Sequence, residues 1–383
     1  MVYARVLVIT ANIGTLADEV DPRLSDWVNQ MVKEICEWKA ELVALHLQNC
    51  TGSHLESKLS IKELALKLKN SENLPTYDAC IVFADSEDKN ENGFTALASI
   101  YFVRSGNCCK IYDFKGRDYV AESAFQYFGN DLPRNKYLQK STFPPDKLTA
   151  KDVKQRGKGF MRTRWILHGQ PCNFVNLHLY GDGTNLGAAK KFPSKYAEQR
   201  AKCLEFVLQS LEPEFSSEPV FIAGDFNTRL DLSGFLNKAA SVEANKLDFF
   251  ADHEWYFSTC NGQMVRKYNK ELTVFDKTLK EPPITFPPTY PYGIDRNKPP
   301  IEFQRKVCPA WRGRVVTNDF AWKLIKQNSF SASSLFYNSI GQKVHMGEHK
   351  PVFLAATLSI SDKITANGVS IKKLKTRDVV NGQ

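Results

Sequence analysis

The sequence predicts a large layered α/β sandwich built as one domain. Apolar runs rich in β-branched residues recur along the 383 residues, and amphipathic helical patterns separate only some of them. Several strands for each helix favour packed sheets over strict βαβ alternation. With 43% hydrophobic residues, the chain can bury a substantial core.

Seven runs have the length and composition of buried or half-buried strands. They are 6–10, 42–47, 79–84, 94–103, 172–179, 219–223 and 352–358. An eighth segment, 156–165, alternates basic and apolar residues as a strand with one polar face would.

Three segments show the apolar spacing of a helix that packs one face on a core. The first follows Asp21-Pro22, where proline suits the start of a helix. Their apolar faces comprise, in turn, Trp27, Met31, Ile35 and Trp38; Ile61, Leu64 and Leu68; and Tyr196, Cys203, Leu204, Val207 and Leu211.

We expect residues 1–360 to form the domain and residues 361–383 a polar tail with a basic cluster at 372–377. That tail could associate weakly with anionic lipid, at about 1 kcal/mol per basic residue. No run is long and apolar enough for a membrane span, and the N-terminus does not have the pattern of a signal peptide. Nine scattered cysteines suit a reducing compartment, so we expect a cytoplasmic monomer, peripheral at the plasma membrane at most.

The net charge of +9 favours an anionic partner, because 51 basic residues exceed 42 acidic ones. An inositol phosphate, a nucleic acid or an acidic membrane surface would each fit. A solvated basic surface with no such partner is equally consistent with the charge.

The most informative motif follows the run 219–223, which leads directly into Gly224-Asp225-Phe226-Asn227. Asp225 and Asn227 are two positions apart, so in extended backbone they point the same way. The carboxylate can accept a proton or meet a cation, and the amide can orient a phosphate or a water.

Other candidate strands also end in polar residues. The first run ends near Asn12, another places Asn176 and His178 on one face, and Glu348-His349-Lys350 precedes the last run. Either histidine alone would be read as a structural residue. Together with Asp225 and Asn227 they supply the base, the donors and the cation ligands that phosphoryl transfer requires.

Two further segments indicate what is bound. Lys158, Arg162 and Arg164 place cations along one segment, and arginine recognises phosphate oxygens in a bidentate manner. An exposed basic strand face is the alternative. The segment 282–292, which contains Tyr290, is too rich in proline for a central strand and predicts a stiff aromatic loop, either a structural clasp or a wall of the site.

These segments, in this order, resemble the inositol polyphosphate 5-phosphatases, and most closely the type I enzymes that act on soluble inositol phosphates. The resemblance extends to about Leu358. Its most specific parts are Phe286-Pro-Pro-Thr-Tyr-Pro-Tyr292, Cys308-Pro-Ala-Trp311 and Met346-Gly-Glu-His-Lys-Pro-Val-Phe353. It implies a DNase I-like four-layer fold in which two packed, mostly antiparallel sheets are flanked by helices.

The resemblance also implies roles for single residues. Asp225 matches the base that activates water, Asn227 helps to position it, and His178 and His349 match the groups on the scissile phosphate. Mg²⁺ is the implied cation, with Asn12 and Asn49 at the metal positions. The expected catalytic residues are Asp225, Asn227, His178, His349 and Glu348, and the expected substrate-binding residues are Lys158, Arg162, Arg164, Lys306, Arg314, Lys350 and Tyr290.

The sequence departs from the family pattern at functional positions. Asn49 stands where the family has a metal-binding glutamate, and Arg312-Gly313-Arg314 stands where it has Cys-Asp-Arg, whose aspartate orients the histidine. Val307 replaces an expected arginine, although Lys306 is adjacent, and Glu348 replaces an aspartate. These changes are expected to weaken cation binding and catalysis.

Two functions therefore stay open. The first is an Mg²⁺-dependent removal of the 5-phosphate from inositol 1,4,5-trisphosphate and inositol 1,3,4,5-tetrakisphosphate, which would end a calcium-release signal. The second is a catalytically impaired member that binds inositol phosphates or a protein. A nuclease is disfavoured, since long basic stripes interleaved with aromatic residues are missing from the sequence. The C-terminal Val380-Asn-Gly-Gln383 does not match a prenylation box.

Overall fold

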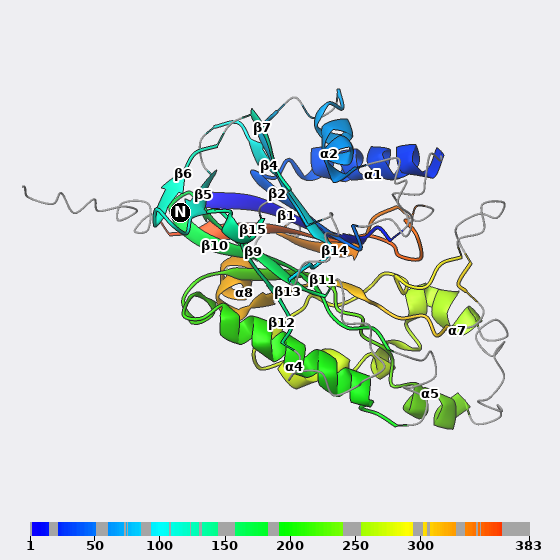
Figure 1. Cartoon of the computed structure of the whole chain (residues 1–383). Coiled ribbons are helices and arrows are strands. Elements are labelled where there is room, and N and C mark those ends of the chain that lie inside the picture. Colours follow the sequence, from blue (N-terminus) through cyan, green and yellow to red (C-terminus); the bar gives the residue numbers. More distant parts are fainter. Residues whose placement is uncertain are drawn as a thin grey trace, which may run out of the picture.

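Two mixed β-sheets packed face to face form the centre of the molecule, and helices cover both outer faces (Figure 1). The computed structural model describes residues 2–14, 22–50, 60–72, 74, 76–85, 93–106, 109–122, 124–129, 132–144, 158–182, 191–239, 254–293, 302–304, 307–326, 334–341, 344 and 346–361. The expected tail beyond Ser361 lies outside these residues.

The first sheet has seven strands in the order β14-β15-β1-β2-β4-β3-β7. Their bounds, in that order, are Leu335–Ser339, Val352–Ile360, Val2–Asn12, Leu42–Gln48, Leu97–Arg104, Tyr77–Ala84 and Ala124–Phe128. The pairs β1–β2 and β3–β7 are parallel, and the other pairs of this sheet are antiparallel.

The second sheet has eight strands in the order β12-β13-β11-β10-β9-β5-β6, with β8 also paired to β9. Their bounds are Leu279–Lys280, Gly313–Asn318, Val220–Asp225, Gln170–His178, Gly159–Leu167, Cys109–Asp113, Asp118–Val120 and, for β8, Gln139–Thr142. Only the pair β10–β11 is parallel among these described strands.

The helices lie on the outer faces of the two sheets and at one end of the sandwich. α1 (Pro22–Trp38) and α2 (Ile61–Lys69) cover the outer face of the seven-stranded sheet, and α4 (Lys195–Ser210) covers that of the other sheet (Figure 1). α8 (Asp319–Lys326) follows β13 and contacts β13 and β15, while α5 (Leu232–Ala239) and α7 (Glu254–Ser258) lie at one end of the sandwich. Short 3₁₀ turns are η2 (Leu132–Arg134), η4 (Glu214–Ser216), η5 (Thr259–Gly262), η6 (Arg266–Tyr268) and η7 (Glu271–Phe275).

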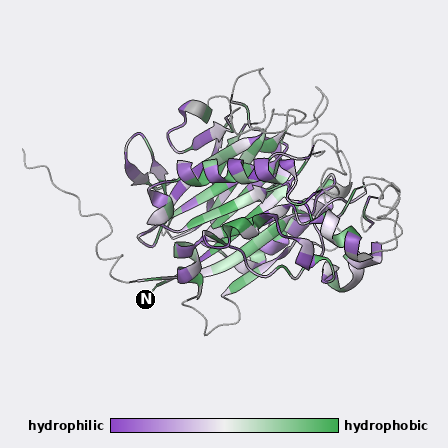
Figure 2. Cartoon of the chain, turned by 90° about the horizontal axis from the view of Figure 1, so that it is seen from below, coloured by the Kyte–Doolittle hydropathy of each residue, from purple (hydrophilic) through white to green (hydrophobic). Residues whose placement is uncertain are grey.

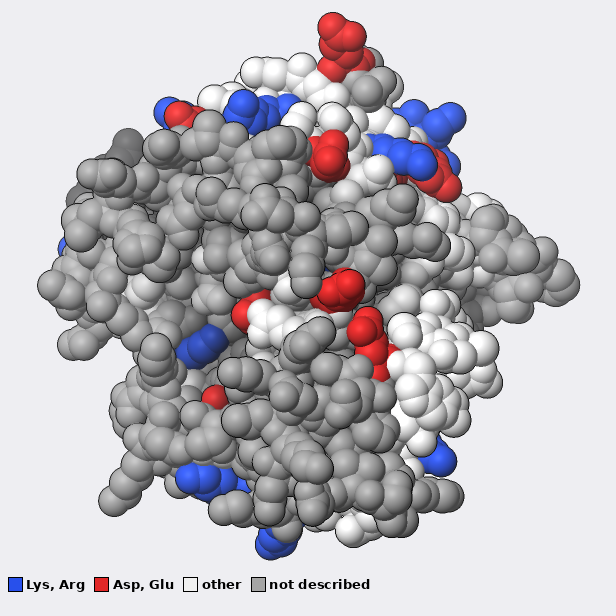
Figure 3. Space-filling view, turned by 90° about the vertical axis from the view of Figure 1, so that its right-hand side faces the viewer, with Lys and Arg blue, Asp and Glu red and all other residues white. Residues whose placement is uncertain are grey.

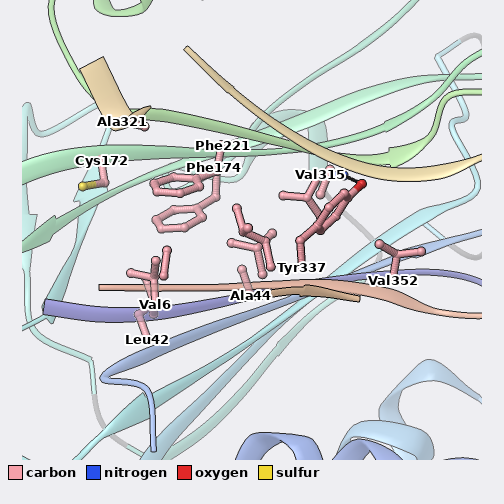
Figure 4. Close-up of a cluster of buried hydrophobic side chains, with 14 of the residues drawn as sticks. Val6, Leu42, Ala44, Cys172, Phe174, Phe221, Val315, Ala321, Tyr337 and Val352 are labelled. Atoms are coloured by element: carbon pink, nitrogen blue, oxygen red, sulfur yellow. Dashed lines mark hydrogen bonds between the residues drawn. The ribbon is translucent and has the colours of Figure 1, made fainter. Parts of the chain in front are cut away.

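Most of the core lies between the two sheets. Figure 4 shows Phe174 and Phe221 stacked there, with ring centroids 5.3 Å apart, opposite Val6 and Leu42 of the first sheet. Figure 2 shows the same division by hydropathy, with apolar strands inside and polar outer faces on the helices. Burial of these apolar surfaces is the main stabilising contribution to the sandwich.

The structure confirms the expected strands and the three expected helices. The run 94–103 begins as a strand only at Leu97, because Ala96 has a φ of 52° and Asp85 accepts hydrogen bonds from the backbone and hydroxyl of Thr95. The proline-rich segment 282–292 is a loop, with isolated bridges at Tyr290 and Tyr292. Within the described residues, no helix has the length and apolar character needed to cross a membrane.

Candidate active site

The space between the sheets changes from apolar to polar at one end. Side chains alternate between the two faces of a strand, so in β11 the inward residues Phe221 and Ala223 are followed by Asp225. Because β10 and β11 are parallel, His178 at the end of β10 lies beside Asp225, its paired residue. β1 and β2 are also parallel, and they end together at Asn12 and Gln48.

Hydrogen bonds join the two sheets at this end. The buried amide of Asn176, on β10, donates to the backbone oxygens of Leu47 (3.1 Å) and Ala98 (2.8 Å) in the other sheet. Its own oxygen accepts from Nε2 of Gln48 at 2.8 Å. These bonds fix the separation of the sheets where the polar side chains gather.

Asp225 is the centre of this polar group and is 1% exposed. Its Oδ2 accepts a hydrogen bond from Nδ2 of Asn12 at 2.7 Å and lies 3.4 Å from Nε2 of His178. Its Oδ1 accepts from the backbone N–H of Asn227 at 2.9 Å. Burial alone would raise the pKa of Asp225, but the hydrogen bond from His178 and the nearby His349 and Lys158 hold it well below its usual range. The carboxylate is therefore ionised at neutral pH.

Asn227 follows the strand in a left-handed conformation with a φ of 52°, which asparagine adopts more readily than most residues. Its Nδ2 donates to the backbone oxygen of Leu179 at 2.7 Å. The Asn227 amide is therefore held by Leu179, and its backbone N–H rather than its side chain contacts Asp225; the extended backbone on which the expected same-side placement depended ends at Asp225.

His178 is buried, and its Nε2 contacts both Asp225 and the ammonium of Lys158. Burial and then Lys158 lower the pKa of His178 to about 4, and burial lowers the pKa of Lys158 to about 8. His178 is thus a neutral imidazole at pH 7. Its Nδ1 is buried without a hydrogen-bond partner in the described part of the chain.

His349 lies in the turn before β15, close enough to Asp225 and His178 to interact with both electrostatically. Its ring packs on that of Tyr290, with centroids 4.7 Å apart, and burial lowers its pKa to about 4. Tyr290 is hydrogen-bonded to Glu348, whose carboxylate also accepts from Gln304 at 2.5 Å. The aromatic loop is therefore a wall of this site.

Gly313 pairs with Asp225 across β11 and β13 and provides no carboxylate for His349. A Cβ at Gly313 would meet only ordinary contacts, the nearest being 3.5 Å from a methyl of Val352. Within the described residues, the imidazole of His349 makes no hydrogen bond to a carboxylate. The position has room for the orienting side chain that the sequence omits.

Asn12 and Asn49 form a hydrogen-bonded chain that ends on Asp225. Nδ2 of Asn49 donates to Oδ1 of Asn12 at 3.1 Å, and the backbone N–H of Gly14 donates to the same oxygen at 3.2 Å. Because Asn12 must donate to the carboxylate, its oxygen faces Asn49, and Asn49 must present its NH₂ group. Asn49 therefore contributes a donor here, which differs from the metal ligand expected at this position.

The donors fit a cation held through a single carboxylate. Among the residues that the structure describes, no three His, Cys, Asp or Glu side chains gather as a metal site. Oδ1 of Asp225 accepts one hydrogen bond and so keeps a lone pair for a cation or water. Proteins commonly hold Mg²⁺ through one or two carboxylates, completed by waters and substrate phosphates. Asp225 fits that arrangement, with Asn12 holding the carboxylate in place.

Arg162 and Arg164 lie outside this group, which corrects the expectation that they bind substrate. Gly159 of β9 pairs with His178, so Arg162 and Arg164, at odd offsets from Gly159, point to the opposite face of the sheet. Asn173 and Glu214 bind Arg162, and Glu218 binds Arg164. Their guanidinium groups are structural.

Arg314 is also a structural residue, for the same reason of alternation. Gly313 faces the space between the sheets, so Arg314 faces away from it. Its guanidinium is 2.8 Å from Glu281 and donates to Asn269 and to the backbone oxygen of Trp311. Its expected role in substrate binding is therefore also corrected.

Of two other residues expected to bind substrate, Lys350 and Lys306, the structure describes only Lys350. Lys350 follows His349 and is 7% exposed, with its ammonium 4.5 Å from the ring centroid of Tyr292 and its pKa lowered by burial to about 8. Lys306 lies outside the described residues.

Two arginines at the site were not predicted. The guanidinium of Arg312 lies 3.3 Å from the ring centroid of Tyr290, and that of Arg229 lies 5.4 Å away. Arg229 is also 3.4 Å from Asp182. Their positions, directly after Gly-Asp-x-Asn-Thr and Pro-Ala-Trp, were the only sequence signal that could have identified them.

Figure 3 views the end of the sandwich at which these strands end. Where described residues are visible on this face, acidic and basic side chains are interspersed. The described residues visible on this one face thus show no continuous basic stripe of the kind that would follow a nucleic-acid backbone.

Comparisons with known proteins agree with this geometry. The model of the endonuclease/exonuclease/phosphatase family 2 matches residues 143–355. Inositol polyphosphate-5-phosphatase A of Homo sapiens is 31% identical, and the match covers 91% of this chain and 92% of that protein. A probable type I inositol 1,4,5-trisphosphate 5-phosphatase of Caenorhabditis elegans is 26% identical over 91% of this chain and 98% of its own length.

Among solved structures, the inositol polyphosphate 5-phosphatase domain of SPsynaptojanin superimposes with a TM-score of 0.53 at 13% identity. The match covers 95% of this chain and 88% of that one. That structure contains inositol (1,4)-bisphosphate and a calcium ion. The likeness confirms the expected DNase I-like sandwich.

Proposed function

Because the chain belongs to the endonuclease/exonuclease/phosphatase family 2 and, within it, to the inositol polyphosphate 5-phosphatases, we propose that it removes the 5-phosphate from soluble inositol phosphates. Inositol 1,4,5-trisphosphate and inositol 1,3,4,5-tetrakisphosphate are the proposed substrates. Their hydrolysis would end a calcium-release signal. The observation that supports the reaction best is the buried, ionised Asp225 with two neutral histidines near it.

Asp225 is the proposed acceptor of the proton from the attacking water. Asn12 and Asn227 fix the carboxylate from two sides, so it needs little reorganisation during the reaction. Its low pKa makes it a weak base, because proton transfer to it is uphill unless the water is acidified.

His178 and His349 are the proposed donors to the oxygens of the scissile phosphate. With pKa values of about 4, both rings are neutral at pH 7 and each carries one N–H; that of His178 can reach the phosphate only when it is not donated to Asp225. Tyr290 supports the ring of His349 and leaves the imidazole without a carboxylate partner among the described residues.

Mg²⁺ is the proposed cation, and Asp225 is the residue that would hold it, with Asn12 and Asn49 beside it. When bound, the cation lowers the pKa of its water and neutralises charge on the phosphate. With one carboxylate, we expect it to bind weakly until the substrate phosphate contributes further oxygens.

The Asp225→Asn variant tests the reaction. It keeps the shape of the side chain but removes the base, so phosphate release from inositol 1,4,5-trisphosphate with Mg²⁺ should fall about 10²- to 10⁴-fold. The matched control is Asp276→Asn, an exposed aspartate at which activity should not change. Retained activity in a correctly folded Asp225→Asn protein would refute the proposed mechanism.

A catalytically impaired binding module is the second candidate, and two observations favour it. Asn49 offers an N–H group where a metal-binding carboxylate is expected, and Gly313 leaves His349 without an orienting carboxylate. Such a protein would bind inositol phosphates or a protein without turnover. Failure of the wild-type chain to release phosphate, with binding intact, would favour this second function.

A further inference from the structure

Arg312 lies in the loop between Trp311 and β13, and its backbone is fixed on both sides. Its N–H donates to the hydroxyl of Thr289 at 3.2 Å, and its carbonyl oxygen accepts from the N–H of Phe226, the residue after Asp225, at 2.9 Å. The loop therefore has a defined position next to the proposed base.

The side chain of Arg312 is buried with most of its hydrogen-bonding capacity unused. It is 6% exposed, and its guanidinium stacks on Tyr290 with 3.3 Å between Cζ and the ring centroid. Its Nε and Nη2 are buried and make no hydrogen bond within the described residues. Arg162, Arg164 and Arg314, by contrast, are each satisfied by carboxylates.

A buried guanidinium with no counter-charge among the described residues needs an explanation. Arginine cannot lose its proton to avoid the cost of burial. A cation–π contact with Tyr290 recovers only part of that cost, since such a contact is worth less than the penalty for burying an unpaired charge. An anion at Nε and Nη2 would supply the missing interaction, and this edge of the guanidinium suits two phosphate oxygens.

The surroundings place this edge within the active site. Tyr290, on which Arg312 stacks, also packs on His349 at 4.7 Å. Lys158, whose ammonium contacts His178, is a second cation of the site, and Arg229, 5.4 Å from the Tyr290 ring, is offset by Asp182.

We infer that Arg312 is an anion-binding residue of this site, which takes two oxygens of a substrate phosphate and allows inositol phosphates to bind without a divalent cation. The inference rests on the proposed function for the identity of the ligand. In this arrangement the fixed guanidinium of Arg312 binds the substrate phosphate, whereas Mg²⁺ is needed only for the hydrolysis.

Calorimetric titration of the full chain tests the inference, with inositol 1,4,5-trisphosphate in EDTA and with its hydrolysis-resistant 5-phosphorothioate analogue in Mg²⁺. The wild-type chain should bind measurably in EDTA, although more weakly than in Mg²⁺, because the cation and the substrate phosphate strengthen each other's binding. Arg312→Gln should weaken binding in EDTA about 10- to 100-fold. Arg312→Lys keeps the charge without the planar fork and should fall between the two.

Arg134→Gln is the control, because it removes the same charge from an exposed side chain distant from the site. Its Kd should equal that of the wild type.

Binding that needs Mg²⁺ in the wild type, or is unchanged by Arg312→Gln in EDTA, would overturn the inference and leave the phosphatase proposal intact. If the wild type binds the trisphosphate under neither condition, the proposed function itself fails. If Arg312→Gln does not fold, the Kd of Arg312→Lys in EDTA, weaker than wild type or equal to it, decides the inference.

Discussion

At the residue scale, two positions of the site carry uncharged residues where the family pattern has carboxylates. Asn49, Asn12 and Asp225 form a chain of two amides and one carboxylate, and position 313 is a glycine. Each substitution has a physical consequence that a variant can reverse. Asn49 also has a φ of 56°, a conformation that suits asparagine better than glutamate.

Asn49→Glu combined with Gly313→Asp should raise both the affinity for Mg²⁺ and the rate of phosphate release. The first change adds a carboxylate near Asp225, and the second adds an acceptor for His349 at a position with room for a side chain. An increase of about 10²-fold or more in kcat is expected, since removal of a histidine-orienting aspartate in another hydrolase costs about 10⁴. The measurement is the rate of phosphate release as Mg²⁺ is titrated.

Equal activity in the wild type and the double variant would show that another residue supplies the missing charge. Glu63 is poorly placed for that role, because it forms the capping box of α2 with Ser60. Its carboxylate accepts from the backbone N–H of Ser60 at 2.7 Å. Glu56, another acidic residue close to position 49 in the sequence, lies outside the described residues.

At the element scale, strand alternation decides which polar residues reach the site. Asp225, His178 and Gly313 share the face between the sheets, whereas Arg162, Arg164 and Arg314 face outward. The sequence shows that Arg162 and Arg164 share a face. It does not show which face, because that depends on the register of β9 against β10.

Gly224 allows the two parallel strands of the site, β10 and β11, to approach each other closely. A Cβ at Gly224 would lie 2.0 Å from the backbone oxygen of Leu177, on the paired strand. No side chain can be accommodated there unless the strands move apart.

Gly224→Ala should therefore lower the free energy of unfolding by about 3 kcal/mol or more. Gly313→Ala is the matched control in the neighbouring strand, and its stability should stay within about 0.5 kcal/mol of wild type. Urea unfolding followed by circular dichroism measures both. If the two variants lose similar stability, the close approach at Gly224 is not what limits this position.

At the scale of the whole molecule, three histidines that are buried among the described residues couple folding to pH. Burial lowers the pKa of His46 to about 3 and those of His178 and His349 to about 4, from 6.5. Below pH 6.5 the unfolded chain takes up protons that the native histidines do not. Stability from these residues is therefore complete above pH 6.5 and is lost as the pH falls toward 4.

The free energy of unfolding should fall by up to about 1.4 kcal/mol per pH unit for each histidine between about pH 6 and pH 4. Urea unfolding at pH 7, 6 and 5 measures the slope. His46→Gln removes one titrating group away from Asp225 and should reduce the slope by about one third. An unchanged slope in this variant would show that His46 does not contribute.

The sequence by itself determined the strands and the three amphipathic helices, because hydrophobic period acts over a few residues. Only the tertiary structure decided what those residues contact. It joined Asn12, Asn49 and Asp225 from three strand ends, directed Arg162 and Arg314 away from the site, and placed the unpaired Arg312 on Tyr290. Such contacts depend on strand register and sheet packing, which bring together residues that are distant along the chain.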